Sequence, residues 1–148
     1  MSVKATLHAN CVLVDEAGIL IRGVSGAGKS AFSRALILAA RNQGLFARLV
    51  SDDRTRVVCR NSRLLAYPVK EIRGLMEVRG IGIVPVPVEN AAVIRLVIDL
   101  VDAAARMPGA DEMAIDILSV KMPRLIQIKG ENIVDLVLGY ICGSDFPT

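Results

Sequence analysis

The chain has 148 residues, of which 53% are hydrophobic and only 3% aromatic, and its formal net charge at pH 7 is +3. This length predicts one domain over residues 1–148, with a core built mostly from aliphatic side chains, as in sheets covered by helices. No apolar run approaches the roughly 18 residues of a membrane span, and no apolar signal segment follows the N-terminus, so we expect no membrane association.

The first elements are two strands, a glycine-rich loop and a helix. A strand is predicted over Thr6–Val14, a turn over Asp15–Gly18, and a second strand over Ile19–Arg22. A helix is predicted from Ser30 to about Gln43, because its apolar positions keep helical spacing, and Gly44 is expected to end it.

Between the second strand and the helix lies a complete Gly-x-x-x-x-Gly-Lys-Ser phosphate-binding loop. Its residues are Gly23, Val24, Ser25, Gly26, Ala27, Gly28, Lys29 and Ser30. Such a loop turns several backbone N–H groups toward one point, and the helix N-terminus that follows also favours anions. We therefore expect Lys29 to reach the β- and γ-phosphates of a nucleotide and the Ser30 hydroxyl to ligate the accompanying Mg²⁺.

The rest of the chain contains more β-structure than a doubly wound nucleotide-binding fold usually has. The predicted elements are a strand over Leu45–Val50, a hairpin of Val57–Arg60 and Leu64–Tyr67, strands over Val93–Leu100 and Leu125–Ile128, and a helix over Asn132–Ile141. The last helix is expected to bury a stripe of Leu136, Val137, Tyr140 and Ile141 and to end at Gly143. The pattern predicts an α/β protein.

Two adjacent carboxylates, Asp52 and Asp53, follow the first strand after the loop. In phosphate-binding folds a second carboxylate lies near the metal at this edge of the sheet. Adjacent side chains point to different sides, so one can support Mg²⁺ while the other accepts a proton from an attacking hydroxyl. The alternative is a structural role in a turn or a cap.

Three further features are candidates for chemistry. Glu77–Ile83 contains two glycines two residues apart, which indicates a bulge or close backbone approach. Glu77 in this segment can ligate a metal. The alternative is that the segment is an ordinary edge strand. His8 is the only histidine, and it is either structural or, if its strand lies beside the loop, part of the site. Arg106 is either a surface residue or a group that stabilises developing charge on a transferring phosphoryl group.

A run of arginines follows the carboxylate pair. Its members, Arg54, Arg56, Arg60 and Arg63, can form a basic face for nucleic acid or an acidic partner, or simply a solvated surface. No aromatic residues are interleaved to stack bases, so we expect no nucleic-acid binding.

Taken together, these segments resemble the C-terminal catalytic domain of HPr kinase/phosphorylase, bacterial enzymes that phosphorylate a serine of the phosphocarrier HPr. The resemblance covers nearly the whole chain, and the Glu-Val-Arg-Gly-Ile-Gly-Ile segment over Glu77–Ile83 is its most specific part. It implies a P-loop kinase domain of the HPr kinase/PEP carboxykinase-like type, with a mixed central sheet and flanking helices, in a short form that lacks the family's N-terminal domain.

The resemblance also implies a role for each candidate residue. Asp53 matches the catalytic base, Asp52 supports the metal region, Ser30 and Glu77 match Mg²⁺ ligands, and His8, Lys29 and Arg106 match the phosphate-site histidine, the loop lysine and the catalytic arginine. The chain departs from the family at Ile126–Asn132, where Lys129 stands without the paired arginines of the dephosphorylation loop. We therefore expect weak or absent phosphorylase activity.

The sequence thus predicts a cytoplasmic, ATP- and Mg²⁺-dependent protein serine kinase acting on HPr or an HPr-like phosphocarrier. By resemblance it is a homo-oligomer, a hexamer, and its three cysteines are expected to be free thiols. Two alternatives stay open: a P-loop kinase of a small anionic metabolite, and a non-catalytic nucleotide-dependent switch. No Asn-Lys-x-Asp segment is present, which argues against a GTPase-type switch.

Overall fold

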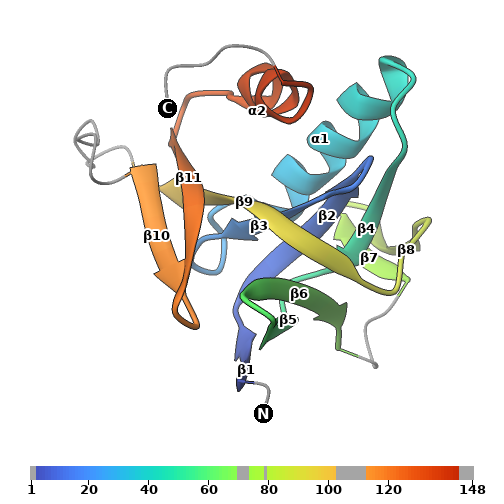
Figure 1. The fold of residues 1–148 in the computed structure, drawn as a ribbon. Helices are drawn as coiled ribbons and strands as arrows, with labels where there is room; N and C mark the ends of the chain where they lie inside the picture. Colours follow the sequence, from blue (N-terminus) through green and yellow to red (C-terminus); the bar gives the residue numbers. More distant parts are fainter. Residues whose placement is uncertain (1–2, 70–73, 79, 103–112, 144–148) are drawn as a thin grey trace.

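A large mixed sheet with two helices on one of its faces makes up the computed structural model, which describes residues 3–69, 74–78, 80–102 and 113–143 (Figure 1). The elements, in chain order, are β1 (Val3–Leu7), β2 (Ala9–Val14), β3 (Ala17–Arg22), α1 (Lys29–Asn42), β4 (Ala47–Ser51), β5 (Thr55–Arg60), β6 (Arg63–Pro68), β7 (Leu75–Val78), β8 (Gly82–Pro85), β9 (Ala92–Val101), β10 (Ala114–Ile117), β11 (Val120–Ile128) and α2 (Val134–Ile141). The predicted α/β class is confirmed. Within these residues, no helix is both long and apolar enough to cross a bilayer.

Strand β9 organises the sheet. The strand order is β1-β5-β6-β9-β3-β2-β4, and β11 also pairs with β9 and carries β10. Strands β3, β9 and β11 are parallel to one another, whereas the other pairs are antiparallel. The carboxyl ends of the three parallel strands therefore meet at one edge, where ligands bind in open α/β sheets.

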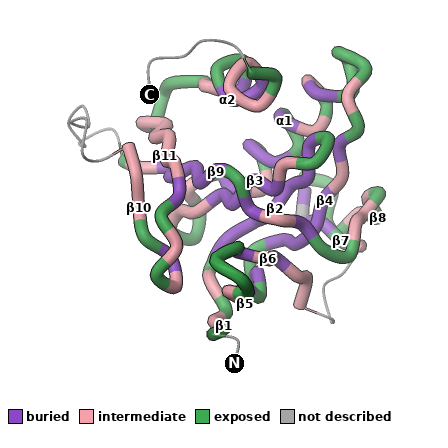
Figure 2. Tube along the Cα trace, viewed as in Figure 1, coloured by how far each residue is buried: buried purple, intermediate pink, exposed green. Residues whose placement is uncertain are grey.

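The sheet separates two hydrophobic cores. One lies between the sheet and the helices, and α1 contributes Phe32, Leu36 and Ala40 to it at a spacing of four residues. Fully burying one large aliphatic side chain, such as that of Leu36, contributes about 2 kcal/mol. The other core contains residues of β2, β3, β4, β5, β6, β9, β10 and β11 and no described helix residue, so it lies on the face of the sheet away from the helices. Figure 2 shows that buried residues are concentrated along β2, β3 and β9.

The predicted strand over Thr6–Val14 is wrong as a single element. The chain bends at His8 and divides it into β1, which pairs with β5, and β2, which pairs with β3 and β4. Every residue of β2 is buried, whereas β1 is mostly exposed at the edge of the sheet. The bend therefore lets one polar residue, His8, leave the sheet while its neighbours stay paired.

Two hairpins are also absent from the predicted elements. Glu77–Ile83 is not one strand with a bulge: β7 and β8 form a separate two-stranded sheet, and Gly80 and Gly82 have φ of 83° and 109°. The β10–β11 turn consists of Leu118 and Ser119, both at positive φ, where side chains are rarely found. Leu118 is not a usual turn former, and a single serine is only a weak turn signal, so the sequence does not predict this hairpin.

The other predicted elements are confirmed with shifted ends. Helix α1 is followed by Gly44 at φ 80°, as expected. Helix α2 starts later than predicted, at Val134, and its stripe is partly wrong: Leu136 is 38% exposed, whereas Leu138 is buried. The cysteines are free thiols, and burial raises the pKa of the Cys11 thiol to about 12.

A buried ion cluster joins the three parallel strands next to the phosphate-binding loop. Asp99 of β9 accepts two hydrogen bonds from Arg22 of β3, at 2.7 and 2.8 Å, and one from Arg124 of β11, at 2.5 Å. The Asp99 side chain is 9% exposed. Burial by itself raises the pKa of Asp99, but the hydrogen bonds and charges of Arg22 and Arg124 hold that pKa below its ordinary value. Because Arg22 precedes Gly23, the cluster fixes the strand end from which the loop begins.

Replacing Asp99 by Asn is expected to lower the free energy of unfolding by about 2 kcal/mol at pH 7, because two arginines lose their shared carboxylate. The folded pKa lies below the ordinary value of 3.8, so the contribution is complete above that pH and is lost as the pH falls through the lowered pKa. Urea unfolding over a series of pH values measures both effects. The gap between wild type and D99N should shrink in acid.

The matched control is Asp116→Asn, which removes an exposed carboxylate from β10 and should change the unfolding free energy by about 0.5 kcal/mol or less. A D99N variant as stable as D116N at pH 7 would show that the cluster does not stabilise the loop edge.

Candidate active site

The loop over residues 23–30 connects the end of β3 to the start of α1, as predicted. Gly26 and Gly28 have φ of 85° and 98°, a conformation that side chains rarely adopt, and a Cβ added at either would meet nothing within 4 Å. Gly28 is also the N-cap of α1. Because glycine has no side chain, no capping side chain accepts a hydrogen bond from the first N–H groups of the helix. The loop thus combines open space with unsatisfied donors, which fits phosphate groups.

Gly23 is needed for a different reason. A Cβ at this position would lie 2.9 Å from the Ala27 Cβ and 3.3 Å from the Leu100 carbonyl oxygen. The loop therefore begins in close contact with β9, and this contact and the Asp99 cluster hold it from two directions. Any side chain at Gly23 would push the loop off the sheet.

Lys29 is almost fully buried at the start of α1, with 6% exposure. Its Nζ donates to the carbonyl oxygens of Gly23, at 2.9 Å, and Val24, at 3.4 Å. The same Nζ lies 3.6 Å from Asp53 Oδ1. The ammonium group is therefore held inside the loop, within reach of the carboxylate pair.

The two aspartates have different environments, as expected for adjacent residues. Asp52 is buried, and its Oδ1 accepts hydrogen bonds from Ser30 Oγ at 2.8 Å and from Asn10 Nδ2 at 3.0 Å. The Asp53 side chain is 58% exposed, and its Oδ1 lies 2.6 Å from His8 Nε2. Asp53 itself has φ 67°, which Asp tolerates better than most residues. The bend at His8 and the turn at Asp53 thus bring the only histidine to the exposed carboxylate.

Sequence reasoning missed Asn10, which links these groups. Its side-chain nitrogen donates to Asp52 and also to Ser33 Oγ, at 3.0 Å each, and its oxygen accepts from the Asp53 backbone N–H at 2.7 Å. Asn10 is completely buried in β2. An amide in the middle of a buried apolar strand is the one sequence signal that pointed to it, because such a group needs partners.

A cavity of about 500 Å³ lies over the loop. It is lined by Ser25, Gly26, Gly28, Lys29, Ser30, Ala31, Arg34, Asp52 and Asp53. The structure thus brings together His8, Lys29, Ser30 and both aspartates, and it adds Arg34 as an exposed cation that was not predicted.

Two predicted residues are not placed at this cavity. The backbone of Glu77 lies in β7 opposite Ile83, and its side chain is outside the described part of the structure. Arg106 falls in residues 103–112, also outside the described residues. Their roles stay predictions. Among the described side chains, no three His, Cys, Asp or Glu groups gather at one point. The oxygens of Ser30 and Asp52 are nevertheless the type of ligand that Mg²⁺ takes when substrate phosphates complete its shell.

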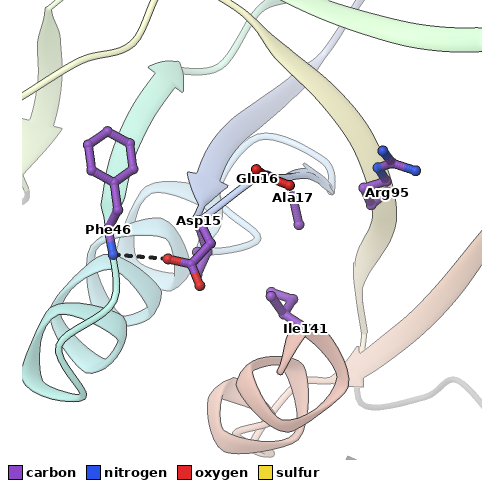
Figure 3. A pocket seen from close by; sticks show the side chains of 7 residues that line it. Asp15, Glu16, Ala17, Phe46, Arg95 and Ile141 are labelled. Carbon is purple, nitrogen blue, oxygen red and sulfur yellow. Dashed lines mark hydrogen bonds between the residues drawn. The ribbon is translucent and has the colours of Figure 1, made fainter. Parts of the chain in front are cut away.

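A second, larger cavity of about 630 Å³ lies at the opposite ends of the parallel strands (Figure 3). Its lining consists of Val14, Asp15, Glu16, Ala17, Phe46, Arg95 and Ile141. Asp15 accepts a hydrogen bond from the Phe46 backbone N–H at 3.2 Å. None of the predicted site residues that the structure describes is part of this lining, and the lining contains no glycine-rich loop and no helix N-terminus. The smaller cavity, over the phosphate-binding loop, is therefore the better candidate for the active site.

Comparisons with known proteins cover most of the chain. The family model described as HPr Serine kinase C-terminal domain matches residues 1–138. The HPr kinase/phosphorylase of Lactobacillus acidophilus is 34% identical over 147 residues, covering 90% of this chain and 44% of that protein. The HPr kinase/phosphorylase of Enterococcus faecalis is 31% identical over 151 residues, covering 93% and 47%. The chain therefore spans less than half the length of these relatives.

A solved structure has the same fold. The Hpr(Ser) kinase/phosphatase from Coxiella burnetii matches with a TM-score of 0.74 and 27% sequence identity, over 93% of this chain and 88% of that one. The predicted fold type, a P-loop kinase domain of the HPr kinase kind, is confirmed.

Replacing Asn10 by Ala is expected to lower the free energy of unfolding by about 3 kcal/mol, because three buried hydrogen bonds are lost and Asp52 and Ser33 lose a donor. Denaturant titration measures the loss. The Asp53 amide proton should also exchange faster with solvent, since its acceptor is gone, and hydrogen–deuterium exchange reports this locally.

Asn42→Ala is the control, since Asn42 is exposed at the end of α1 and should change stability by about 0.5 kcal/mol or less. Equal stability of N10A and N42A, with unchanged exchange at Asp53, would rule out the linking role of Asn10.

Proposed function

Because the chain belongs to the HPr serine kinase C-terminal domain family, we propose that it is a kinase that transfers the γ-phosphoryl group of ATP to a serine of HPr or an HPr-like phosphocarrier. The observation that carries the proposal is the place of the exposed Asp53 carboxylate. It lies beside the buried loop lysine and next to His8, at the mouth of the loop cavity. A nucleotide switch or simple binding loop does not need an exposed carboxylate at this point.

In the proposed reaction, the residues of the phosphate-binding loop hold ATP, the phosphoryl donor. The N–H groups of the loop and of the first turn of α1 bind the phosphates, and Lys29 exchanges its hydrogen bonds to Gly23 and Val24 for phosphate oxygens. Ser30 and Asp52 would hold Mg²⁺, together with Glu77, whose role as a ligand is implied by the family resemblance. When bound, Mg²⁺ supplies positive charge that offsets the charge of the phosphates.

Asp53 acts on the acceptor. A serine hydroxyl placed beside Asp53 gives up its proton to the carboxylate as the oxygen bonds to the γ-phosphorus and the bond to ADP breaks. His8 Nε2, when it carries the proton, donates to Asp53 and holds the carboxylate in one orientation. The buried Asn10 network fixes the backbone of Asp53 from the other side. Such positioning lowers the entropy cost of bringing the hydroxyl and the phosphoryl group together.

The reverse reaction, in which phosphate attacks phosphoserine, is proposed to be weak. The segment after β11 has one exposed cation, Lys129, in place of paired arginines, so it offers less charge to a second phosphate. Assembly as a hexamer is implied by the resemblance, and residence in the cytoplasm is inferred from the sequence; both stay predictions.

Replacing Asp53 by Asn is expected to lower the rate of phosphate transfer to HPr at least about a hundredfold, because the proton acceptor is lost. Asn keeps the size of the side chain and tolerates the positive φ of this position. Transfer of label from γ-labelled ATP to the carrier serine measures the rate. ATP affinity should equal that of the wild type or exceed it, since a carboxylate no longer repels the phosphates.

Asp15→Asn serves as the matched control, because Asp15 is also exposed and also has positive φ, at 51°, but lies in the β2–β3 turn. D15N should transfer phosphate like the wild type. Full transfer by D53N with normal ATP binding would refute the role of Asp53, and label on a small metabolite instead of HPr would favour a metabolite kinase.

A further inference from the structure

The outer face of strands β1, β5 and β6 is a basic surface. Residues directly opposite in antiparallel strands point to the same side, and the registers align Lys4, Val58 and Leu65 in one row and Thr6, Arg56 and Tyr67 in the next. Arg60 and Arg63 form a third row beside the turn. We call the face formed by Lys4, Thr6, Arg56, Val58, Arg60, Arg63, Leu65 and Tyr67 the basic sheet face.

The charge of this face has one sign. Lys4, Arg56, Arg60 and Arg63 are all exposed, and none of the residues 3–7, 55–60 and 63–68 is Asp or Glu. The chain as a whole has a net charge of only +3, with 15 acidic residues elsewhere. Four of the 18 lysines and arginines therefore lie on this face, and its three strands contribute no carboxylate beside them. A face of this kind attracts an acidic surface over distances of about 10 Å.

The centre of the face is apolar. Val58 is 9% exposed, and Leu65 and Tyr67 are half-buried. The Arg56 guanidinium lies over the Tyr67 ring, 5.2 Å from its centroid. An apolar centre with Tyr and Arg, surrounded by charged side chains, is the composition of protein–protein interfaces. A nucleic-acid surface of this type would need further aromatic side chains for base stacking, and the three strands contain only Tyr67.

The basic sheet face continues into the candidate active site. Strand β1 ends at Leu7, next to His8, and β5 begins at Thr55, two residues after Asp53. Arg54, the residue between Asp53 and Thr55, is also an exposed cation. A protein that rests on this face is therefore in contact with the same strands that present the base.

We propose that the basic sheet face docks an acidic surface of the protein substrate and so delivers its serine to Asp53. The inference rests on the proposed kinase function and adds the substrate's chemistry: carboxylates that meet Lys4, Arg56 and Arg63, around an apolar patch that meets Leu65 and Tyr67. Docking of this type acts on the affinity for the protein and not on the transfer step.

The test is the double variant Lys4→Gln/Arg63→Gln, which removes two exposed cations and leaves Arg56 and Tyr67 in place. The KM for HPr should rise about fivefold, with the maximal rate and the KM for ATP unchanged. Raising NaCl from about 20 mM to about 200 mM should weaken HPr binding to the wild type more than to the variant. The control Arg41→Gln/Lys121→Gln changes the net charge equally, at exposed positions on α1 and β11, and should behave like the wild type.

HPr binding is also measured without ATP, by fluorescence anisotropy, so that docking is separated from catalysis. If the wild type transfers phosphate to HPr and K4Q/R63Q has the same KM and the same affinity, the docking surface is refuted and the kinase function stands. If the wild type transfers no phosphate to HPr, the kinase function is refuted; retained binding of HPr that K4Q/R63Q loses would still support the surface. Tighter binding of a short DNA duplex than of HPr, lost in K4Q/R63Q, would overturn the proposal in favour of nucleic acid.

Discussion

The arrangement of the candidate site depends on one buried amide. Asn10 uses both of its N–H donors and its carbonyl oxygen on three groups: the Ser33 hydroxyl of α1, the carboxylate of Asp52 and the backbone N–H of Asp53. Because the amide is buried, each of these bonds is costly to break, since no water replaces it. One side chain of β2 therefore sets the distance between the helix that follows the phosphate-binding loop and the carboxylates that face it.

The curvature of the sheet positions the other parts of the candidate site. The parallel strands β3, β9 and β11 supply the edge at which the loop begins, and the antiparallel strands β1, β5 and β6 turn away from it around the second core. The chain passes between the two parts at His8 and again at Asp53. Asp53 and His8 are thus located where the phosphate-binding loop meets strands β1 and β5, which is the position that the proposed transfer from a nucleotide to a protein requires.

Local sequence signals were sufficient to predict part of the fold and of the candidate site. The phosphate-binding loop, α1 with Gly44, and the β5–β6 hairpin follow from motif, periodicity and turn residues, and all are present. The family followed from the loop, the aspartate pair and the Glu77–Ile83 segment, and the comparisons confirm it. The bend at His8, the turn at Leu118 and the hydrogen bonds of Asn10 were not predictable in this way. Each is imposed by partners distant in sequence: β5 on β1, β9 on β11, and α1 and Asp52 on Asn10.

The central place of β9 has a consequence for the order of folding. Strands β3 and β6 lie on either side of β9, so a nascent chain that has not yet reached residue 92 leaves an edge of each unpaired. Unpaired edges invite association between chains, and contacts between distant segments form slowly. The phosphate-binding loop, although encoded in the first fifth of the chain, therefore acquires its native support only late in synthesis, and protease resistance of ribosome-bound chains of increasing length would show when it does.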